Sequence, residues 1–222
     1  MHFYRGTLTL DDGTEVELEK IGKGAFSTAY ITTSGRHRKV YVITQQEDAG
    51  DYSKEIISHI NSYTRSPYIP KIEYVGCLND GSCVYRMPKY EAPLRKSGHP
   101  KAWAQYRTLK KCWEEAEENV RKVYRKRYGF WKAGYHLRFA GHEVMNEVID
   151  CAKRAKVSRG LIRALELLKS ESSNYGAGYS FEFSPRNLAT SGKDQLILLD
   201  VIFDRESIAK RRDRADRKAR GY

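Results

Sequence analysis

Three oxygen-bearing side chains near the carboxyl end have the types and spacing of a site for magnesium and nucleotide phosphates. Glu182 precedes Asn187 by five residues, and Asn187 precedes Asp200 by thirteen. Carboxylate and carboxamide oxygens are hard ligands that suit Mg²⁺ bound to phosphates. Asp200 follows the apolar run Leu196–Leu199, which we expect to be a buried strand, where an unpaired charge is costly. Metal coordination would explain this position; the simpler interpretation is an Asp that caps a core strand.

A second candidate lies near the amino end, within Ile21–Tyr30. Gly22 and Gly24 flank Lys23 between two expected strands, and Phe26 follows them. Because glycine has no Cβ atom, backbone N–H groups there can approach a phosphate closely, and an aromatic ring can fold over the loop as a lid. The alternative is an ordinary tight hairpin, since two glycines in a turn are common.

The elements that must position these residues begin with a β-rich part over residues 1–90. Alternating polar and apolar residues around the turn signals Asp11–Gly13, Ser34–Gly35 and Asn79–Gly81 predict three antiparallel hairpins. The expected strands are 7–10, 14–18, 29–33, 39–44, 72–77 and 82–87. Isoleucines at helical spacing predict one helix over 52–63, between the second and third hairpins.

The rest of the chain changes character. Within residues 91–204, apolar residues recur every three or four positions as far as about residue 175, which predicts helices. Two short strands are expected after them, at 188–190 and 195–199, and residues 205–222 form a basic helix or tail. The expected organisation is therefore a β-rich part, a helical part and a basic end.

The order of these features resembles the protein kinase family. The first features are a Gly-rich hairpin, a Lys-bearing strand, a helix and the segment Ser66–Ile72. A hairpin into Met87–Pro88 follows, then helices, and then Glu182, Asn187 and Asp200. More narrowly, Gly24–Tyr30, the turn at Glu47–Gly50 and the Arg/Lys-rich tail resemble the early serine/threonine kinases of short-tailed lytic bacteriophages. The resemblance implies an α+β, bilobal fold, with an antiparallel sheet and one helix in the N-lobe and a reduced helical C-lobe.

The resemblance also implies an activity, which is transfer of the γ-phosphoryl group of ATP, with Mg²⁺, to Ser or Thr of host proteins during host takeover. Gly22, Gly24 and Phe26 would cover the phosphates, and Met87 would meet the adenine. Asn187 and Asp200 would hold Mg²⁺, and Glu182 stands where the family has its catalytic Asp. Glu55 on the expected helix would pair with the strand lysine.

Three departures from the family leave catalysis open. The family's phosphate-contacting lysine falls near Tyr41, whereas Lys39 lies two residues earlier on the same strand face. A slip in the register of this short hairpin would let Lys39 take the place of that lysine at the phosphates. Glu182 is one methylene longer than Asp, which displaces its oxygens by roughly 1 Å and costs on the order of 10²-fold in rate. Asp200 is followed by Val201 and Ile202, where the family has Phe and Gly. Only 22 residues follow Asp200, which are too few for an activation segment and a full peptide-docking lobe. The alternative is a catalytically dead pseudokinase that binds and inhibits a host factor, such as RNA polymerase or a defence protein.

The net charge of +12 is concentrated in two segments. Residues 101–138 hold eleven basic and four acidic residues, a net charge of +7. Residues 204–222 hold eight basic and four acidic residues, a net charge of +4. Cations alternate with tyrosines in Arg121–Tyr128, so a nucleic-acid-binding module acting through Arg121–Arg127 and the tail is a further alternative. A solvated helix face that pairs with Glu114–Glu118 would explain the same pattern. For the tail, docking to an acidic partner is favoured over an exposed helix with internal ion pairs.

Other classes of protein are disfavoured. No apolar run approaches the roughly 18 residues that cross a bilayer, and Met1–Arg5 lacks the apolar stretch of a secretory signal, so we expect no membrane contact and a cytoplasmic protein, in the host cell if phage-encoded. The cysteines and histidines show no metal-binding spacing. Cys77 and Cys83 are expected to face each other across the third hairpin as reduced thiols.

Overall fold

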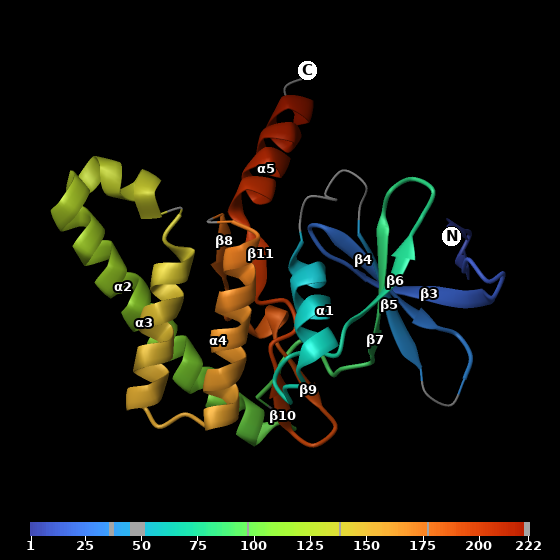
Figure 1. Ribbon diagram of the computed structural model, residues 1–222, viewed down its shortest axis with the longest axis horizontal. Helices are drawn as coiled ribbons and strands as arrows, with labels where there is room; N and C mark the ends of the chain where they lie inside the picture. The colour runs from blue at the N-terminus through green and yellow to red at the C-terminus, as the bar shows by residue number, and fades with distance from the viewer. Residues whose placement is uncertain (36–37, 45–51, 97, 138, 177, 220–222) are drawn as a thin grey trace. The chain divides into compact units, whose positions relative to one another are not determined.

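The computed structural model describes residues 1–222 except 36–37, 45–51, 97, 138, 177 and 220–222 (Figure 1). The chain divides into two compact units. The first comprises Met1–Thr64 and Lys71–Lys89, and the second comprises Arg65–Pro70 and Tyr90–Tyr222. The turn expected at Glu47–Gly50 lies outside the described residues.

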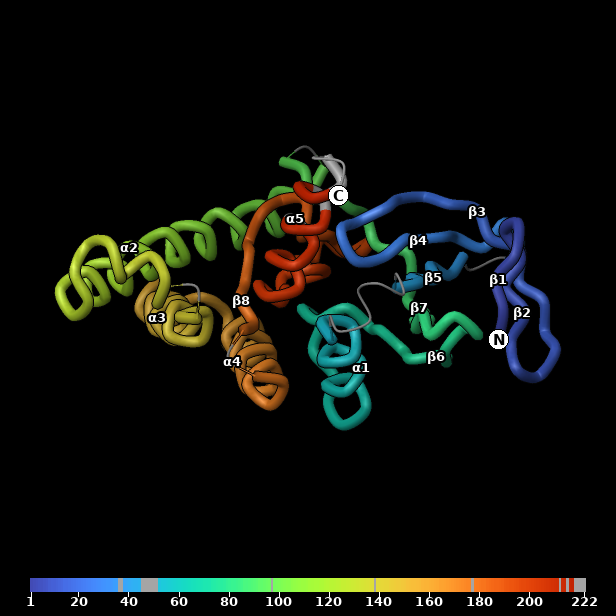
Figure 2. The backbone as a smooth tube through the Cα atoms, turned by 90° about the horizontal axis from the view of Figure 1, so that it is seen from above, coloured from blue at the N-terminus to red at the C-terminus, as the bar shows by residue number. Residues whose placement is uncertain are grey.

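The first unit is a curled antiparallel sheet with one helix. Its seven strands are β1 (His2–Tyr4), β2 (Thr7–Thr9), β3 (Glu15–Lys23), β4 (Ser27–Thr32), β5 (Lys39–Thr44), β6 (Glu73–Cys77) and β7 (Cys83–Pro88). They lie in the order β1-β2-β3-β4-β5-β7-β6, and β1 and β2 curl away at one edge (Figure 2). Helix α1 (Ser53–Tyr63) follows β5. All three expected hairpins form, and β1 adds a strand that the sequence pattern did not predict.

Both faces of β5 are buried, and the register shows what covers each face. Tyr41 and Ile43 pack with Leu8, Leu18 and Val84, so this face is covered by the N-terminal strands. Val40 and Val42 point the other way because side chains alternate along a strand, and both are only 4% exposed. A lysine on β5 therefore lies either on the face covered by the N-terminal strands or on the face of Val40 and Val42, depending on its position.

The second unit is mainly helical, with α2 (Pro100–Leu137), α3 (Gly141–Arg154), α4 (Arg159–Asn174) and α5 (Arg205–Ala219). Helix α3 packs against both α2 and α4 (Figure 1). Apolar residues at helical spacing form the shared core, and α4 begins where the Ser158 hydroxyl accepts a hydrogen bond from the Leu161 N–H. Two small strand pairs complete the unit: β9 (Ala189–Ser191) with β10 (Gln195–Ile197), and β8 (Tyr179–Phe181) with β11 (Ile202–Asp204).

Helix α2 is broken at Gly129, where φ is 75° and ψ is 164°. A side chain at such dihedral angles would meet its own backbone, so glycine is the residue that permits the break. The ring of Tyr128 stacks on that of His136, with centroids 3.9 Å apart. The segment after Gly129 therefore folds back against the end of the segment before it.

The described residues thus form a mixed fold with an antiparallel sheet and five α-helices. None of these helices combines the length and the apolar character that a membrane crossing requires.

The predicted cysteine pair is present at the β6–β7 hairpin. Cys77 and Cys83 occupy directly opposed positions, and their Sγ atoms are 3.2 Å apart. The hydroxyl of Tyr74 lies 3.1 Å from the Sγ of Cys77. Burial, followed by the hydrogen bond with Cys77, raises the pKa of Cys83 to about 11. The thiolate of Cys83 is therefore scarce at neutral pH, which slows oxidation of the pair.

Mild oxidation with diamide at pH 9 or so is expected to join Cys77 to Cys83. Because this disulfide would close a short loop, its formation should raise the free energy of unfolding by about 2 kcal/mol. Thiol titration and intact mass measure the loss of two thiols. A Cys77→Ser variant is the control and should keep its remaining thiols under the same treatment, since Cys112 and Cys151 are buried. Loss of thiols from this variant at the same rate would contradict the assignment.

Candidate functional site

The pairing of β8 with β11 brings together the segments that carry Glu182, Asn187 and Asp200. Phe181 lies opposite Ile202 in this pair. Just beyond it, the N–H of Glu182 donates to the carbonyl of Val201 at 2.9 Å, and the N–H of Asp200 donates to the carbonyl of Asn187 at 2.9 Å. Two main-chain hydrogen bonds therefore hold the three segments side by side.

Asn187 ends a 3-10 turn, Pro185–Asn187, which the surrounding backbone holds in place. Its N–H donates to the carbonyl of Ser184 at 3.0 Å. The N–H of Leu94 donates to the carbonyls of both Pro185 and Leu188, each at 2.9 Å, and Leu188 is fully buried. Since proline has a preset φ and no N–H to leave unpaired, Pro185 suits the first position of this turn.

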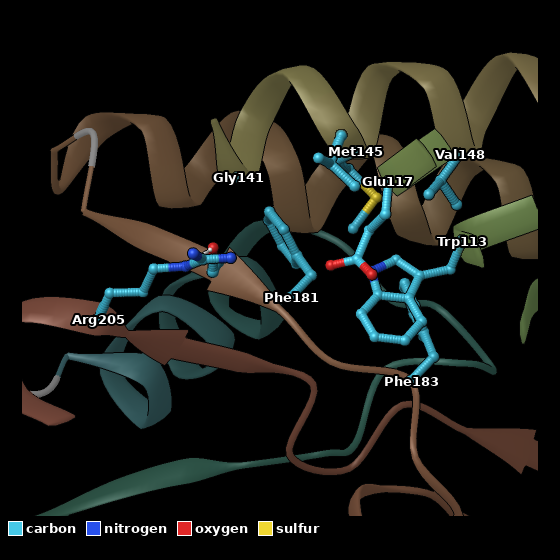
Figure 3. A pocket seen from close by; sticks show the side chains of 10 residues that line it. Trp113, Glu117, Gly141, Met145, Val148, Phe181, Phe183 and Arg205 are labelled. Atoms are coloured by element: carbon cyan, nitrogen blue, oxygen red, sulfur yellow. Dashed lines mark hydrogen bonds between the residues drawn. The ribbon is translucent and has the colours of Figure 1, made fainter. Parts of the chain in front are cut away.

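Glu182 is oriented by the phenylalanines on either side of it. Phe181 and Phe183 are buried and line a small cavity with Trp113, Met145 and other residues of α2 and α3 (Figure 3). In extended chain the intervening side chain points the opposite way, and that of Glu182 is 31% exposed. Its Oε1 accepts a hydrogen bond from Nη2 of Arg186 at 3.0 Å. Within the described part of the chain, Oε2 has no partner and is available to a ligand.

Another carboxylate, Glu117, lines this cavity beside Trp113 (Figure 3). Burial raises the pKa of Glu117, and the nearby charges of Arg121 and Arg205 oppose that effect. Arg205 is itself held by a hydrogen bond from its Nε to the hydroxyl of Ser180 on β8, at 2.5 Å. Arg205 therefore ties the start of α5 to β8, the strand that leads to Glu182.

The expected burial of Asp200 is wrong. Strand β10 ends at Ile197, and Asp200 lies three residues further on, exposed to solvent. Because Asp200 is exposed, the cost of a buried charge gives no reason to expect a metal at this position. The case for a ligand rests instead on the main-chain link between Asp200 and Asn187.

These oxygens fit the way proteins bind Mg²⁺ with a nucleotide. Among the described residues, no group of three His, Cys, Asp or Glu side chains could enclose a metal ion. Mg²⁺ usually keeps several waters and takes one or two protein oxygens together with substrate phosphates. A half-buried carboxamide at Asn187 and an exposed carboxylate at Asp200 match that smaller requirement.

The predicted phosphate loop is the connection between β3 and β4 in the first unit. The N–H of Gly24 donates to the carbonyl of Ser27 at 2.8 Å, and Gly22 lies opposite Ala29 after a bulge in β3. Neither glycine has a positive φ, and a Cβ at Gly22 would meet nothing within 4 Å. Turn geometry and packing among the described residues therefore do not require these glycines, and their bare backbone leaves room for a ligand. Phe26 is half-buried at the tip.

The lysine and the acid that were expected to pair are not brought together. Lys39 is exposed, and its N–H donates to the hydroxyl of Thr32 at 3.1 Å. It alternates with Val40 and so lies on the face of β5 that includes Tyr41. In the described part of the chain no ion pair involves Lys39.

Glu55 lies in the first turn of α1 and is exposed. Burial first, and then the charges of Cys83 and Glu55, raise the pKa of Tyr85. Tyr85 lies directly opposite Val42, on the face away from Tyr41. The positions of β5 on the face away from Tyr41 are Val40, Val42 and Thr44, none of which carries a charge.

Of the remaining positions, Tyr41 is 4% exposed and belongs to the core of the first unit. Met87 is half-buried near the end of β7, opposite Val40. The structure thus links Glu182, Asn187 and Asp200 within one unit, and in the described part of the other unit no ion pair joins Lys39 to Glu55. Sequence reasoning missed the β8–β11 pair, although Tyr179 and Phe181 alternate with a polar residue as a short strand would.

Comparison with models of known protein families finds no match for this chain. Comparison with curated proteins likewise finds no significant match. Among solved structures, the chain is similar to one described as the kinase domain of PF14_0431, with 10% sequence identity and a TM-score of 0.34. The alignment covers 85% of this chain and 43% of that chain, so this chain spans less than half of its length. A structural neighbour of this protein is therefore a kinase domain, and the likeness is distant.

Proposed function

We propose that this chain is a kinase-like protein that binds ATP with Mg²⁺ and transfers the γ-phosphoryl group to a Ser or Thr hydroxyl of another protein. The observation that supports this most is the joining of Glu182, Asn187 and Asp200 by the β8–β11 pair and the hydrogen bond from Asp200 to Asn187. Asn187 and Asp200 would hold the metal ion, which would neutralise charge on the phosphates.

In the proposed reaction the acceptor hydroxyl oxygen forms a bond to the γ-phosphorus. The bond between that phosphorus and the bridging oxygen breaks, and ADP leaves with the electron pair. Glu182 accepts the hydroxyl proton through Oε2, because Oε1 is occupied by Arg186. Arg186 also restricts the Glu182 side chain, which favours a single orientation of the accepting oxygen.

The acceptor is proposed to be a host protein, with the protein acting in the cytoplasm during phage takeover of the host. This finer proposal rests on the resemblance of Gly24–Tyr30 and the basic tail to the early kinases of short-tailed phages. Gly22, Gly24, Phe26 and Met87 keep their proposed roles at the phosphates and the adenine. The open backbone at Gly22 and Gly24 is compatible with those roles.

A pseudokinase that binds and inhibits a host factor is the second candidate, and the geometry of β5 favours it. Lys39 is exposed and makes no ion pair with the described residues, and Tyr41 is packed into the core. Without a lysine on the phosphates, nucleotide binding can persist while the transition-state charge is left less stabilised.

One pair of measurements tests the proposal and separates the two candidates. With ATP and Mg²⁺ at about 100 times the Kd, the free energy of unfolding should rise by about 2.7 kcal/mol. For a chain of this length that corresponds to an increase in Tm of roughly 5–10 °C, which EDTA should remove. Transfer of labelled phosphate to the chain or to host proteins identifies the kinase, and a shift without transfer identifies the pseudokinase. Absence of any Mg²⁺-dependent shift would overturn the proposal.

A further inference from the structure

The fold-back of α2 exposes an unusual group of aromatic side chains. Phe130 is 66% exposed, Trp131 90%, Tyr135 61% and Phe139 49%. All four lie after the break at Gly129, in the part of α2 that curls over in Figure 1 and in the residues just after it. Exposed apolar rings gathered in one segment are costly in water unless something covers them, so they mark an interaction site.

The same segment carries positive charge that acidic residues do not neutralise. Residues 119–142 include seven Lys or Arg and no Asp or Glu. Arg121 and Lys122 form ion pairs with Glu118, with Nη1 of Arg121 3.1 Å from Oε2 and Nζ of Lys122 3.9 Å from Oε1. Arg125, Lys126, Arg127 and Lys132 are exposed, and none has an ion pair within the part of the chain that the structure describes.

The cations and the rings are in contact with one another. The guanidinium of Arg125 lies 5.1 Å from the centroid of the Phe130 ring, and that of Arg127 lies 5.3 Å from the Tyr128 ring. Phe130 and Trp131 meet edge to face at 5.6 Å. The helix-end patch, defined as the four exposed rings together with Arg125, Lys126, Arg127 and Lys132, therefore presents π-faces and positive charge on one segment.

We propose that the helix-end patch binds single-stranded nucleic acid. Unpaired bases offer flat π-faces for rings such as Trp131, and the phosphates between them match unpaired cations at short intervals. A duplex hides its base faces and would use only the cations. This site is independent of the kinase-like proposal, because it uses no residue assigned to ATP or Mg²⁺.

The contacts favour a nucleic acid over an anionic lipid surface. A helix that lies in a membrane interface separates its cations from its apolar side chains on opposite faces. Here Arg125 lies against the Phe130 ring of the helix-end patch, and Arg127 lies against the neighbouring ring of Tyr128. A purely acidic protein surface would satisfy the cations but would provide no partner for four exposed rings.

The test measures binding of fluorescein-labelled oligothymidylate and oligouridylate of about twenty nucleotides to the full chain by anisotropy. Binding to a labelled duplex of the same length and to phosphatidylserine vesicles is measured separately, so that the affinities can be compared. We expect binding to the single strands at about 50 mM salt, tighter than to the duplex, and weakening steeply towards about 200 mM. Tighter binding to oligothymidylate would indicate single-stranded DNA as the natural ligand, and tighter binding to oligouridylate would indicate RNA. Either result supports the proposal.

Two variants examine the rings and the cations separately. Trp131→Ala should weaken binding to the single strands about tenfold, because one base loses its stacking partner. Lys126→Gln with Lys132→Gln should make the logarithmic salt slope shallower by roughly 1.4, at about 0.7 for each cation. All three side chains are exposed, so folding should be unaffected.

Matched controls lie elsewhere on the chain. Tyr4 is 61% exposed and has Arg5 over its ring at 5.1 Å, so Tyr4→Ala removes a similar contact outside the patch. Lys111→Gln with Arg163→Gln removes the same charge as the double variant from exposed helix positions. Both controls should bind like the unaltered chain. The proposal is overturned by no binding to single strands, by equal losses in the controls, or by vesicles that bind more tightly and depend on Trp131.

Discussion

Replacing Asp200 with alanine is expected to abolish the Mg²⁺-dependent stabilisation of this chain by ATP. Asp200 supplies the only carboxylate of the proposed metal pair, and its loss leaves Asn187 as a neutral ligand. Where the chain transfers phosphate, the rate should fall roughly a thousandfold, which corresponds to about 4 kcal/mol of lost charge stabilisation. Thermal unfolding with ATP and Mg²⁺, read beside phosphate transfer, measures both effects.

The substitution should leave the fold intact, because Asp200 is exposed and its link to Asn187 uses the main chain. The Tm without ligand should therefore change little. Asp150→Ala is the matched control, since Asp150 is an exposed acid on α3 of the same unit. A full ATP shift in Asp200→Ala, equal to that of Asp150→Ala, would remove the assignment of Asp200 to the metal.

Replacing Gly141 with alanine is expected to have the largest effect on stability. Gly141 begins α3 and lies directly against β8. A Cβ there would collide with the carbonyl of Tyr179 and would lie 2.7 Å from the hydroxyl oxygen of Ser180. Backbone cannot yield as a flexible side chain can, so the free energy of unfolding should fall by about 3 kcal/mol. The expected decrease in Tm is roughly 6–12 °C.

Gly134 provides the comparison for this effect, because it lies in α2 and a Cβ there would meet nothing within 4 Å. Gly134→Ala should be neutral or stabilising by up to about 1 kcal/mol, since alanine favours helix more than glycine does. Equal Tm values for the two variants would show that α3 and β8 are not in close contact. Because β8 leads into Glu182, Gly141→Ala should also weaken ATP binding.

Much of the first unit could be predicted from local pattern. The turn signals at Asp11–Gly13 and Asn79–Gly81 do join antiparallel strands, and the isoleucines of α1 are buried as their spacing predicted. The opposition of Cys77 and Cys83 follows from the same hairpin. These features depend on residues a few positions apart, so a single sequence contains the information that forms them.

The sequence by itself determined the types and spacing of Glu182, Asn187 and Asp200, and the excess of positive charge in α2. Only the tertiary structure decided that β8 pairs with β11, that Asp200 is exposed, and that Tyr41 is packed into the core of the first unit. It also decided that Gly129 breaks α2 and exposes Trp131. Pairing and burial depend on segments distant in the chain, because a strand edge or an apolar side chain is satisfied by whichever partner the whole fold brings to it.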